Sequence, residues 1–193
     1  TVLAVMVLSL TGCGGGNSSN GASGKNLSEL VIAIPDEIEG TDIAQVNWSN
    51  IVHELIYASP VIYDMEMKEL LTSAASSYEV SSDGKELIFT FPEDATFSNG
   101  EPLTADAIKK SMEWYVEHSP YSGDYDPIEE VMVKDSQTLV FRLAKPTAYL
   151  WPVLTSTYNG PNDAKVAEEL GKEAYHRNAV GNGLYYVDEW IQG

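Results

Sequence analysis

The sequence has little cysteine and little positive charge, and each shortage excludes a class of protein. Its 193 residues include one Cys, which excludes an internal disulfide framework and any zinc site built from several cysteines. Lys and Arg number 11 against 29 Asp and Glu, which gives a formal net charge of −18. Nucleic acid and anionic lipid are bound through clustered basic side chains, so neither is an expected partner.

Charged side chains are absent from residues 1–24. The apolar run at residues 1–10 is far shorter than the roughly 20 residues that span a bilayer, and it has the length of a signal-peptide hydrophobic region. Because it starts at Thr1 with no basic segment before it, we expect the beginning of this signal to be missing. The sequence therefore predicts export, with residues 1–12 as the signal peptide.

The single cysteine follows this run directly. Leu10-Thr11-Gly12-Cys13 resembles a bacterial lipobox, in which small residues precede the cysteine whose sulfur takes up a diacylglyceryl group. The alternative is an incidental cysteine in an apolar stretch. Gly, Ser and Asn dominate the residues that follow, and this composition is typical of a flexible tether. We therefore predict that residues 13–26 are a lipidated Cys13 and a tether, which anchor the protein at the outer face of the membrane or in the periplasm.

Residues 27–193 mix short β-patterned runs with amphipathic helices, which predicts an α+β fold. Strands are expected at 30–34, 61–63 and 184–187, hairpins at 75–91 and 131–143, and helices at 46–57, 105–118, 149–151 and 162–171. Asp83-Gly84 marks the turn of the first hairpin, and Thr104 is the expected N-cap of the longest helix. The expected apolar face of that helix comprises Ile108, Met112, Tyr115 and Val116.

Motifs for catalysis and metal binding are missing. No nucleophile elbow or phosphate-binding loop is present, and the three histidines are far apart in sequence, so a packed or solvated histidine is the favoured interpretation of each. Acidic clusters at 36–42 and 124–130 would suit calcium, but they lack EF-hand spacing, which favours solvated loops. We expect no enzyme activity, no metal and no cofactor.

Four stretches together resemble one family. They are residues 75–91 (ASSYEVSSDGKELIFTF), 97–108 (FSNGEPLTADAI), 131–150 and 178–190 (NAVGNGLYYVDEW). They are similar, in this order, to the motifs of the extracellular solute-binding proteins of family 5, which serve oligopeptide, dipeptide and nickel ABC importers. The resemblance implies a two-lobed, type II (cluster C) periplasmic-binding-protein-like fold. Residues 27–193 would then be the N-terminal part of the solute-binding domain, with an extra subdomain at about 66–160 and the second lobe missing.

The resemblance also implies ligand-binding positions. Asn182 and Gly183 match a motif of the oligopeptide branch in which the Asn side chain lies in the peptide cleft; the alternative is a turn residue with positive φ. Tyr121 matches a loop that places a tyrosine near the ligand, with an exposed loop aromatic as its alternative. Tyr57 and Trp48 complete the candidate cleft residues. The family's Glu after the first helix is absent at residues 57–60, and Ala179 replaces a Pro; these departures bear on the class of ligand.

The leading hypothesis is a monomeric, lipid-anchored binding protein that captures an extracellular peptide or related solute and delivers it to an ABC permease. Its rivals are a membrane-tethered hydrolase and a sensor or adhesion domain that retained the fold. The motifs do not separate peptide, nickel-chelate, haem and opine binders.

Overall fold

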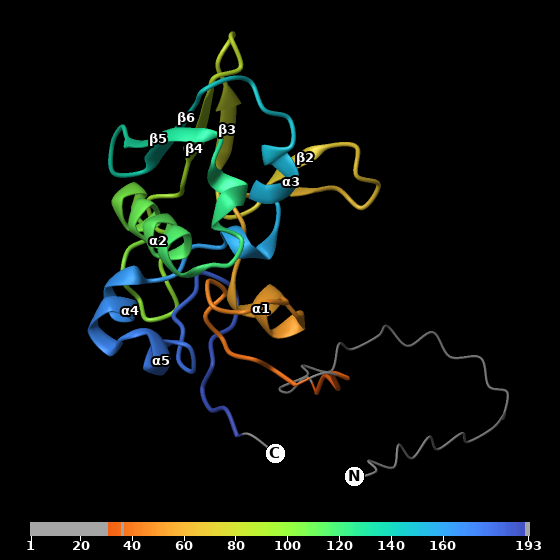
Figure 1. Cartoon of the computed structure of the whole chain (residues 1–193), viewed down its shortest axis with the longest axis vertical. Coiled ribbons are helices and arrows are strands. Elements are labelled where there is room, and N and C mark those ends of the chain that lie inside the picture. The colour runs from red at the N-terminus through yellow and green to blue at the C-terminus, as the bar shows by residue number, and fades with distance from the viewer. Residues whose placement is uncertain (1–30, 36, 192–193) are drawn as a thin grey trace, which may run out of the picture. The chain divides into compact units, whose positions relative to one another are not determined.

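The fold is built on a four-stranded antiparallel sheet, in a computed structural model that describes residues 31–35 and 37–191 (Figure 1). Its strands are β3 (Ser77–Val80), β4 (Glu86–Thr90), β5 (Ile128–Val133) and β6 (Thr138–Leu143), in the order β3-β4-β6-β5. The two predicted hairpins, β3–β4 and β5–β6, are confirmed. Gly84 has a φ of +69° in the first of these turns, a conformation that glycine adopts without steric cost.

The central strands β4 and β6 supply the middle of the first hydrophobic core. Phe89 and Phe141 are buried there, with ring centroids 5.4 Å apart. This core also takes in Val61, Phe91, Phe97, Leu103, Ile108, Leu150 and Leu154. It therefore draws together residues from most of the described chain.

Helix α2 (Ala105–His118) is confirmed with the predicted bounds. The Thr104 hydroxyl oxygen accepts a hydrogen bond from the Ala107 N–H at 3.2 Å, which satisfies one N-terminal donor. The predicted apolar face was wrong at one position: Val116 is 46% exposed, and Trp114 is buried instead. The ring of Trp114 packs edge to face against Tyr175, and its indole N–H donates to the Asp42 carboxylate at 3.1 Å. That contact joins segments far apart in the sequence, so helical periodicity could not indicate it.

A second hydrophobic core joins residues 43–46 to three short helices: α1 (Ile51–Ile56), α4 (Ala164–Leu170) and α5 (Lys172–Tyr175). The prediction at 162–171 is confirmed by α4, whereas α1 is shorter than the predicted 46–57. It begins after Asn50, whose side chain accepts from the Val52 N–H at 2.9 Å, while His53 Nδ1 accepts from the Asn50 N–H at 3.0 Å. This reciprocal cap starts the helix five residues later than the apolar pattern indicated.

Three further short helices follow α2 in the sequence. They are η1 (Ser122–Tyr125), α3 (Leu150–Leu154) and η2 (Thr157–Asn159). The helix predicted at 149–151 is confirmed by α3. η1 lies between α2 and β5 in the sequence.

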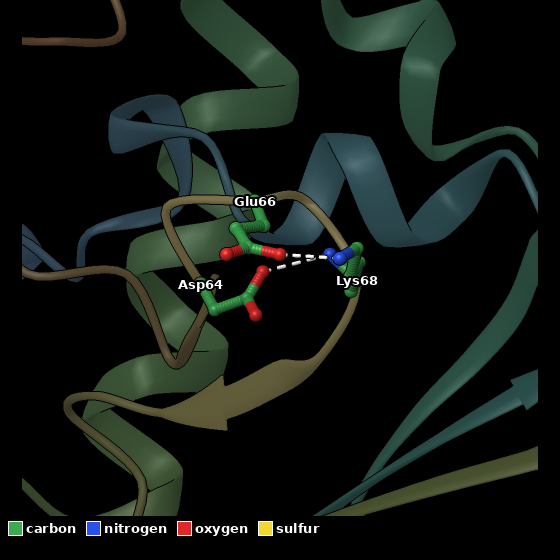
Figure 2. Close-up of polar contacts among 3 residues, drawn as sticks. All are labelled: Asp64, Glu66 and Lys68. Atoms are coloured by element: carbon green, nitrogen blue, oxygen red, sulfur yellow. Dashed lines mark hydrogen bonds and ion pairs between the residues drawn. The ribbon is translucent and has the colours of Figure 1, made fainter.

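A separate two-stranded hairpin consists of β1 (Val61–Tyr63) and β2 (Leu70–Thr72). Figure 2 shows the loop that joins them: Lys68 forms an ion pair with Glu66, and its backbone N–H donates to Asp64 Oδ1 at 2.7 Å. Met67 has a positive φ of 57° in this loop. The predicted strand at 61–63 is confirmed.

Two other predicted strands were wrong. A strand was predicted at 30–34. Its described residues, 31–34, form no strand, and Val31 is 82% exposed. Residues 184–187 also form no strand, and Leu184 is 96% exposed. Apolar and aromatic runs favour extended backbone, but a strand also needs a partner for its backbone hydrogen bonds, and the described residues form no ladder with either run.

Candidate functional site

Residues 181–185 lie along the end of α1 through backbone contacts. The Gly183 N–H donates to the Ile56 carbonyl at 2.9 Å, and the Tyr185 N–H donates to the Leu55 carbonyl at 3.2 Å. The Asn182 side chain makes two bonds to Ala58: Oδ1 accepts from its N–H at 2.9 Å and Nδ2 donates to its carbonyl at 2.9 Å. The alternative of Asn182 as a positive-φ residue is wrong, because Met67 is the one non-glycine residue with positive φ in the described chain.

The glycines of this segment permit the close approach. A Cβ at Gly181 would lie 2.0 Å from the Ile56 carbonyl oxygen, and a Cβ at Gly183 would lie 2.5 Å from the Ile56 carbonyl carbon. Real Cβ atoms do not approach backbone atoms so closely. Residues 181–185 can therefore occupy this position only with glycine at both sites.

A pocket of about 240 Å³ borders this contact. We call it the Glu54 pocket, because Glu54 carries the one carboxylate among the residues that line it: Glu54, Leu55, Tyr57, Ala58, Ser59, Ile62, Ser73, Thr155, Thr157, Gly183, Leu184 and Tyr185. The Thr157 hydroxyl donates to Glu54 Oε1 at 2.5 Å. This pocket thus offers one oriented carboxylate, hydroxyl groups and apolar side chains.

A second pocket, of about 310 Å³, lies beside the loop that precedes α1. We call it the aromatic pocket; its lining residues are Asn47, Trp48, Ser49, Tyr115, Tyr121, Asp124, Tyr125, Val153, Ser156, Tyr158 and Asn159. The hydroxyls of Tyr121 and Tyr158 both donate to the Asn47 carbonyl, at 2.8 and 3.2 Å, and the Ser49 N–H donates to the Tyr158 hydroxyl oxygen at 2.9 Å. The rings of Tyr121 and Tyr158 meet edge to face, with centroids 5.6 Å apart.

The five predicted ligand-binding residues fall in two places. Trp48 and Tyr121 line the aromatic pocket, whereas Tyr57 and Gly183 line the Glu54 pocket. Asn182 lies beside Gly183 with its amide bonded to Ala58. Tyr57 is only 3% exposed, and its hydroxyl donates to the Thr41 carbonyl at 2.9 Å. Burial raises the pKa of Tyr57 well above the ordinary value. A ligand-binding role for these residues stays a prediction.

Glu54, Asp124, Thr157 and Tyr158 are among the residues of these pockets that sequence reasoning missed. Glu54 falls in a predicted helix and Asp124 in an acidic loop, so neither differs in pattern from the other surface carboxylates. Tyr158 precedes Asn159-Gly160, a turn-forming pair, and that was the one available signal of a loop aromatic.

The histidines and carboxylates of the described residues do not form a metal site. No group of three or more His, Cys, Asp or Glu side chains suited to a metal ion occurs among them. His53 is a packed histidine, one of the two interpretations favoured from the sequence. It is fully buried, and its Nε2 bonds the Gly40 carbonyl at 3.0 Å. Desolvation lowers its pKa. Of the carboxylates near 124–130, Glu130 pairs with Arg142.

Two predictions concern residues near the N-terminus. Cys13, the predicted lipidation site, lies outside the described residues, as do the signal peptide and the tether. Among the residues that the structure describes, no helix has the length and apolar character needed to cross a membrane.

Comparison with known proteins decides the family. The family model described as bacterial extracellular solute-binding proteins, family 5, middle, matches residues 69–193. The chain belongs to this family. The matched span includes the four-stranded sheet, α2, Tyr121 and the 181–185 segment.

Relatives with described functions agree with this family 5 assignment. The chain is 29% identical over 124 residues to the probable D,D-dipeptide-binding periplasmic protein DdpA of Escherichia coli, covering 62% of this chain and 24% of the relative. It is 28% identical to the oligopeptide-binding protein OppA of Bacillus subtilis over 98% of this chain and 39% of that relative. The chain thus spans about a quarter to two-fifths of the length of these proteins.

A solved structure supports the same fold. The Haemophilus influenzae OppA in complex with RPPGFSPFR superposes on this chain with a TM-score of 0.69 and 28% identity, over 79% of this chain and 34% of the other. The predicted fold class, a partial segment of a two-lobed type II solute-binding protein, is therefore confirmed. Family 5 consists of extracytoplasmic solute-binding proteins associated with ABC importers.

Proposed function

We propose that this chain belongs to a lipid-anchored protein that captures an extracellular peptide or closely related solute and delivers it to the permease of an ABC importer. In the whole protein, two lobes would close on the ligand by a hinge motion. The observation that carries the proposal is the family match over residues 69–193. Peptides are the ligands named for OppA and the dipeptide-binding relatives, and this is why we propose a peptide rather than another solute.

The chemistry of the two pockets favours binding over hydrolysis. Hydrolysis by a nucleophile needs a general base within hydrogen-bonding reach of it. The three histidines of the chain are placed elsewhere: His53 is buried, His118 Nδ1 bonds the Trp114 carbonyl at 2.9 Å, and the His176 ring packs against Gly40. Neither pocket is lined by a histidine, cysteine or lysine. Both instead offer ring faces, hydroxyls and a carboxylate, the groups that orient a peptide.

Calorimetry on the whole purified protein tests the proposal. Synthetic di- to nonapeptides should bind with a stoichiometry of one and return intact by mass spectrometry after prolonged incubation. Trp48→Leu should weaken this binding, whereas Tyr149→Leu, which removes an exposed aromatic ring outside both pockets, should not. Cleavage of the peptides, or no heat of binding with any of them, would contradict the proposal.

Lipid anchoring needs its own experiment. Growth with an alkyne-labelled fatty acid should label the protein through Cys13, and Cys13→Ser should remove the label and release the protein from the membrane fraction. Membrane retention of the unlabelled variant would show that Cys13 is not the anchor. Delivery to a permease is tested by uptake of a labelled peptide, which should stop when either the binding protein or the permease is deleted.

A further inference from the structure

The aromatic pocket has a charge and a shape that indicate what it binds. Its volume of about 310 Å³ is at the lower end of the range for small-molecule sites, so it suits one side chain or a small organic group rather than a whole peptide. Its walls include the rings of Trp48, Tyr121 and Tyr158. Trp48 is 76% exposed, an unusual state for so large an apolar surface next to a hollow.

The hydroxyl groups of Tyr121 and Tyr158 already form hydrogen bonds within the protein. The hydroxyls of Tyr121 and Tyr158 donate to the Asn47 carbonyl, which fixes both rings against the loop. Burial raises the pKa of Tyr158, so its hydroxyl stays protonated and neutral at physiological pH. A ligand in this pocket therefore meets ring faces and edges more than hydroxyl donors.

One charge remains in the pocket, and it is negative. Asp124 is exposed, and within the described residues its carboxylate has no hydrogen bond or ion pair. No Lys, Arg or His is among the residues that line the pocket. Aromatic faces attract cations through their quadrupole, and an adjacent carboxylate adds to that attraction.

We propose that the aromatic pocket is a subsite for a cationic group, the ammonium or guanidinium of a basic side chain of the captured peptide, held against Trp48 and Tyr121 and opposite Asp124. This inference rests on the proposed function for the source of the cation, but the chemistry of the pocket stands on its own residues. It names a ligand preference: basic peptides over neutral peptides of equal size.

Matched peptides on the whole protein test the preference. A tripeptide with a central lysine should bind about 10-fold more tightly than the same tripeptide with norleucine, which has the same chain without the charge; this ratio equals about 1.4 kcal/mol. Asp124→Asn and Trp48→Leu should each reduce the ratio several-fold. The controls Asp126→Asn and Tyr149→Leu remove an exposed carboxylate and an exposed ring outside the pocket, and should leave the ratio unchanged.

A second arm separates this inference from the proposed function. Butylammonium should quench tryptophan fluorescence in the wild type and not in Trp48→Leu, with a weaker effect in Asp124→Asn, while butanol should have no effect. Equal affinity for the lysine and norleucine peptides overturns the cation subsite and leaves peptide capture in place. If neither peptide binds but butylammonium still does, peptide capture fails and the cation subsite is supported. If butylammonium behaves like butanol, the subsite is overturned whatever the peptides do.

Discussion

The side-chain amide of Asn182 forms a closed pair with the backbone of Ala58, donating to its carbonyl and accepting from its N–H, both at 2.9 Å, across 124 residues of sequence. An amide side chain has the same donor and acceptor as a peptide unit, so Asn182 extends the backbone contact between 181–185 and 55–58 by one more pair. We expected this side chain to face a peptide ligand. In the structure it bonds the backbone N–H and carbonyl of Ala58, and its role in ligand binding stays a prediction.

Asn182→Ala should therefore lower the stability of the fold. The change removes both bonds and leaves the partly buried N–H and carbonyl of Ala58 without partners, at a cost of about 1–3 kcal/mol. Urea unfolding followed by circular dichroism measures this. Asn178→Ala, which removes one exposed side-chain bond to Ala174, is the matched control and should cost much less. Equal midpoints for the two variants would show that the Asn182 pair contributes nothing.

Gly183→Ala should destabilise the same contact by a steric route. The new Cβ would lie 2.5 Å from the Ile56 carbonyl carbon and would push 181–185 away, at about 1–3 kcal/mol or more. Gly123→Ala is the control, because its Cβ would meet nothing closer than Asp126 Oδ2 at 3.9 Å. Differential scanning calorimetry should show a large loss of Tm for the first variant only. A neutral Gly183→Ala would mean that the segment can move without penalty.

His53 should make the fold sensitive to mild acid. Desolvation lowers its pKa in the folded state below the ordinary 6.5, so the folded protein binds fewer protons there than the unfolded chain does. The contribution of neutral His53 to the free energy of unfolding is complete above about pH 7. It is lost as the pH falls below 6.5 towards the folded-state pKa. His53→Gln, whose amide can also bond Asn50 and Gly40 but does not titrate, should lose less stability between about pH 7 and pH 5. Parallel pH profiles for the two proteins would refute a role for His53.

Replacement of Asp42 by asparagine should lower the stability of the fold. It is fully buried, and its carboxylate accepts from the Ala44 N–H, the Gln45 side chain and the Trp114 indole, at 3.0, 2.6 and 3.1 Å. Asp42→Asn replaces one acceptor oxygen by a donor and should cost about 1–3 kcal/mol in chemical unfolding.

Asp106→Asn is the control for that change, because it alters an exposed carboxylate paired with Lys110, where only a few tenths of a kcal/mol are expected. If the two variants unfold at the same denaturant concentration, the bonds to Asp42 are not a source of stability.

Local chemistry explains which parts of the fold could be predicted from sequence. The cap at Thr104 and the turn at Asp83-Gly84 depend on neighbouring residues alone, and both were correctly placed. The family resemblance was also visible, because its motifs are themselves local segments. The predictions that failed depended on distant partners. Residues 184–187 look like a strand, yet they join no sheet, and the Tyr185 N–H instead donates to the Leu55 carbonyl at the end of α1.

In the candidate site, too, distant contacts set the features that sequence reasoning did not predict. Trp48 and Tyr121 were expected to lie in one cleft with Tyr57, Asn182 and Gly183. The structure places Trp48 and Tyr121 in one pocket and Tyr57 and Gly183 in another, with Asn182 bonded to Ala58 beside the second. Asp124 and Tyr158 enter the aromatic pocket through η1 and η2, two single turns whose positions follow from packing and not from sequence pattern. The bond from Tyr158 to Asn47 spans 111 residues, and no local rule predicts such a contact.

The close contact between 181–185 and 55–58 has a consequence for how this protein can change during evolution. Backbone atoms, two glycines and one amide hold the segments together, and the side chains of Leu184 and Tyr185 remain largely exposed beside the Glu54 pocket. Substitutions at Leu184 or Tyr185 can alter the shape and polarity of that pocket without moving the chain that carries them. We therefore expect that, under the proposed function, ligand preference diverges through single substitutions here while the scaffold keeps its geometry and its stability.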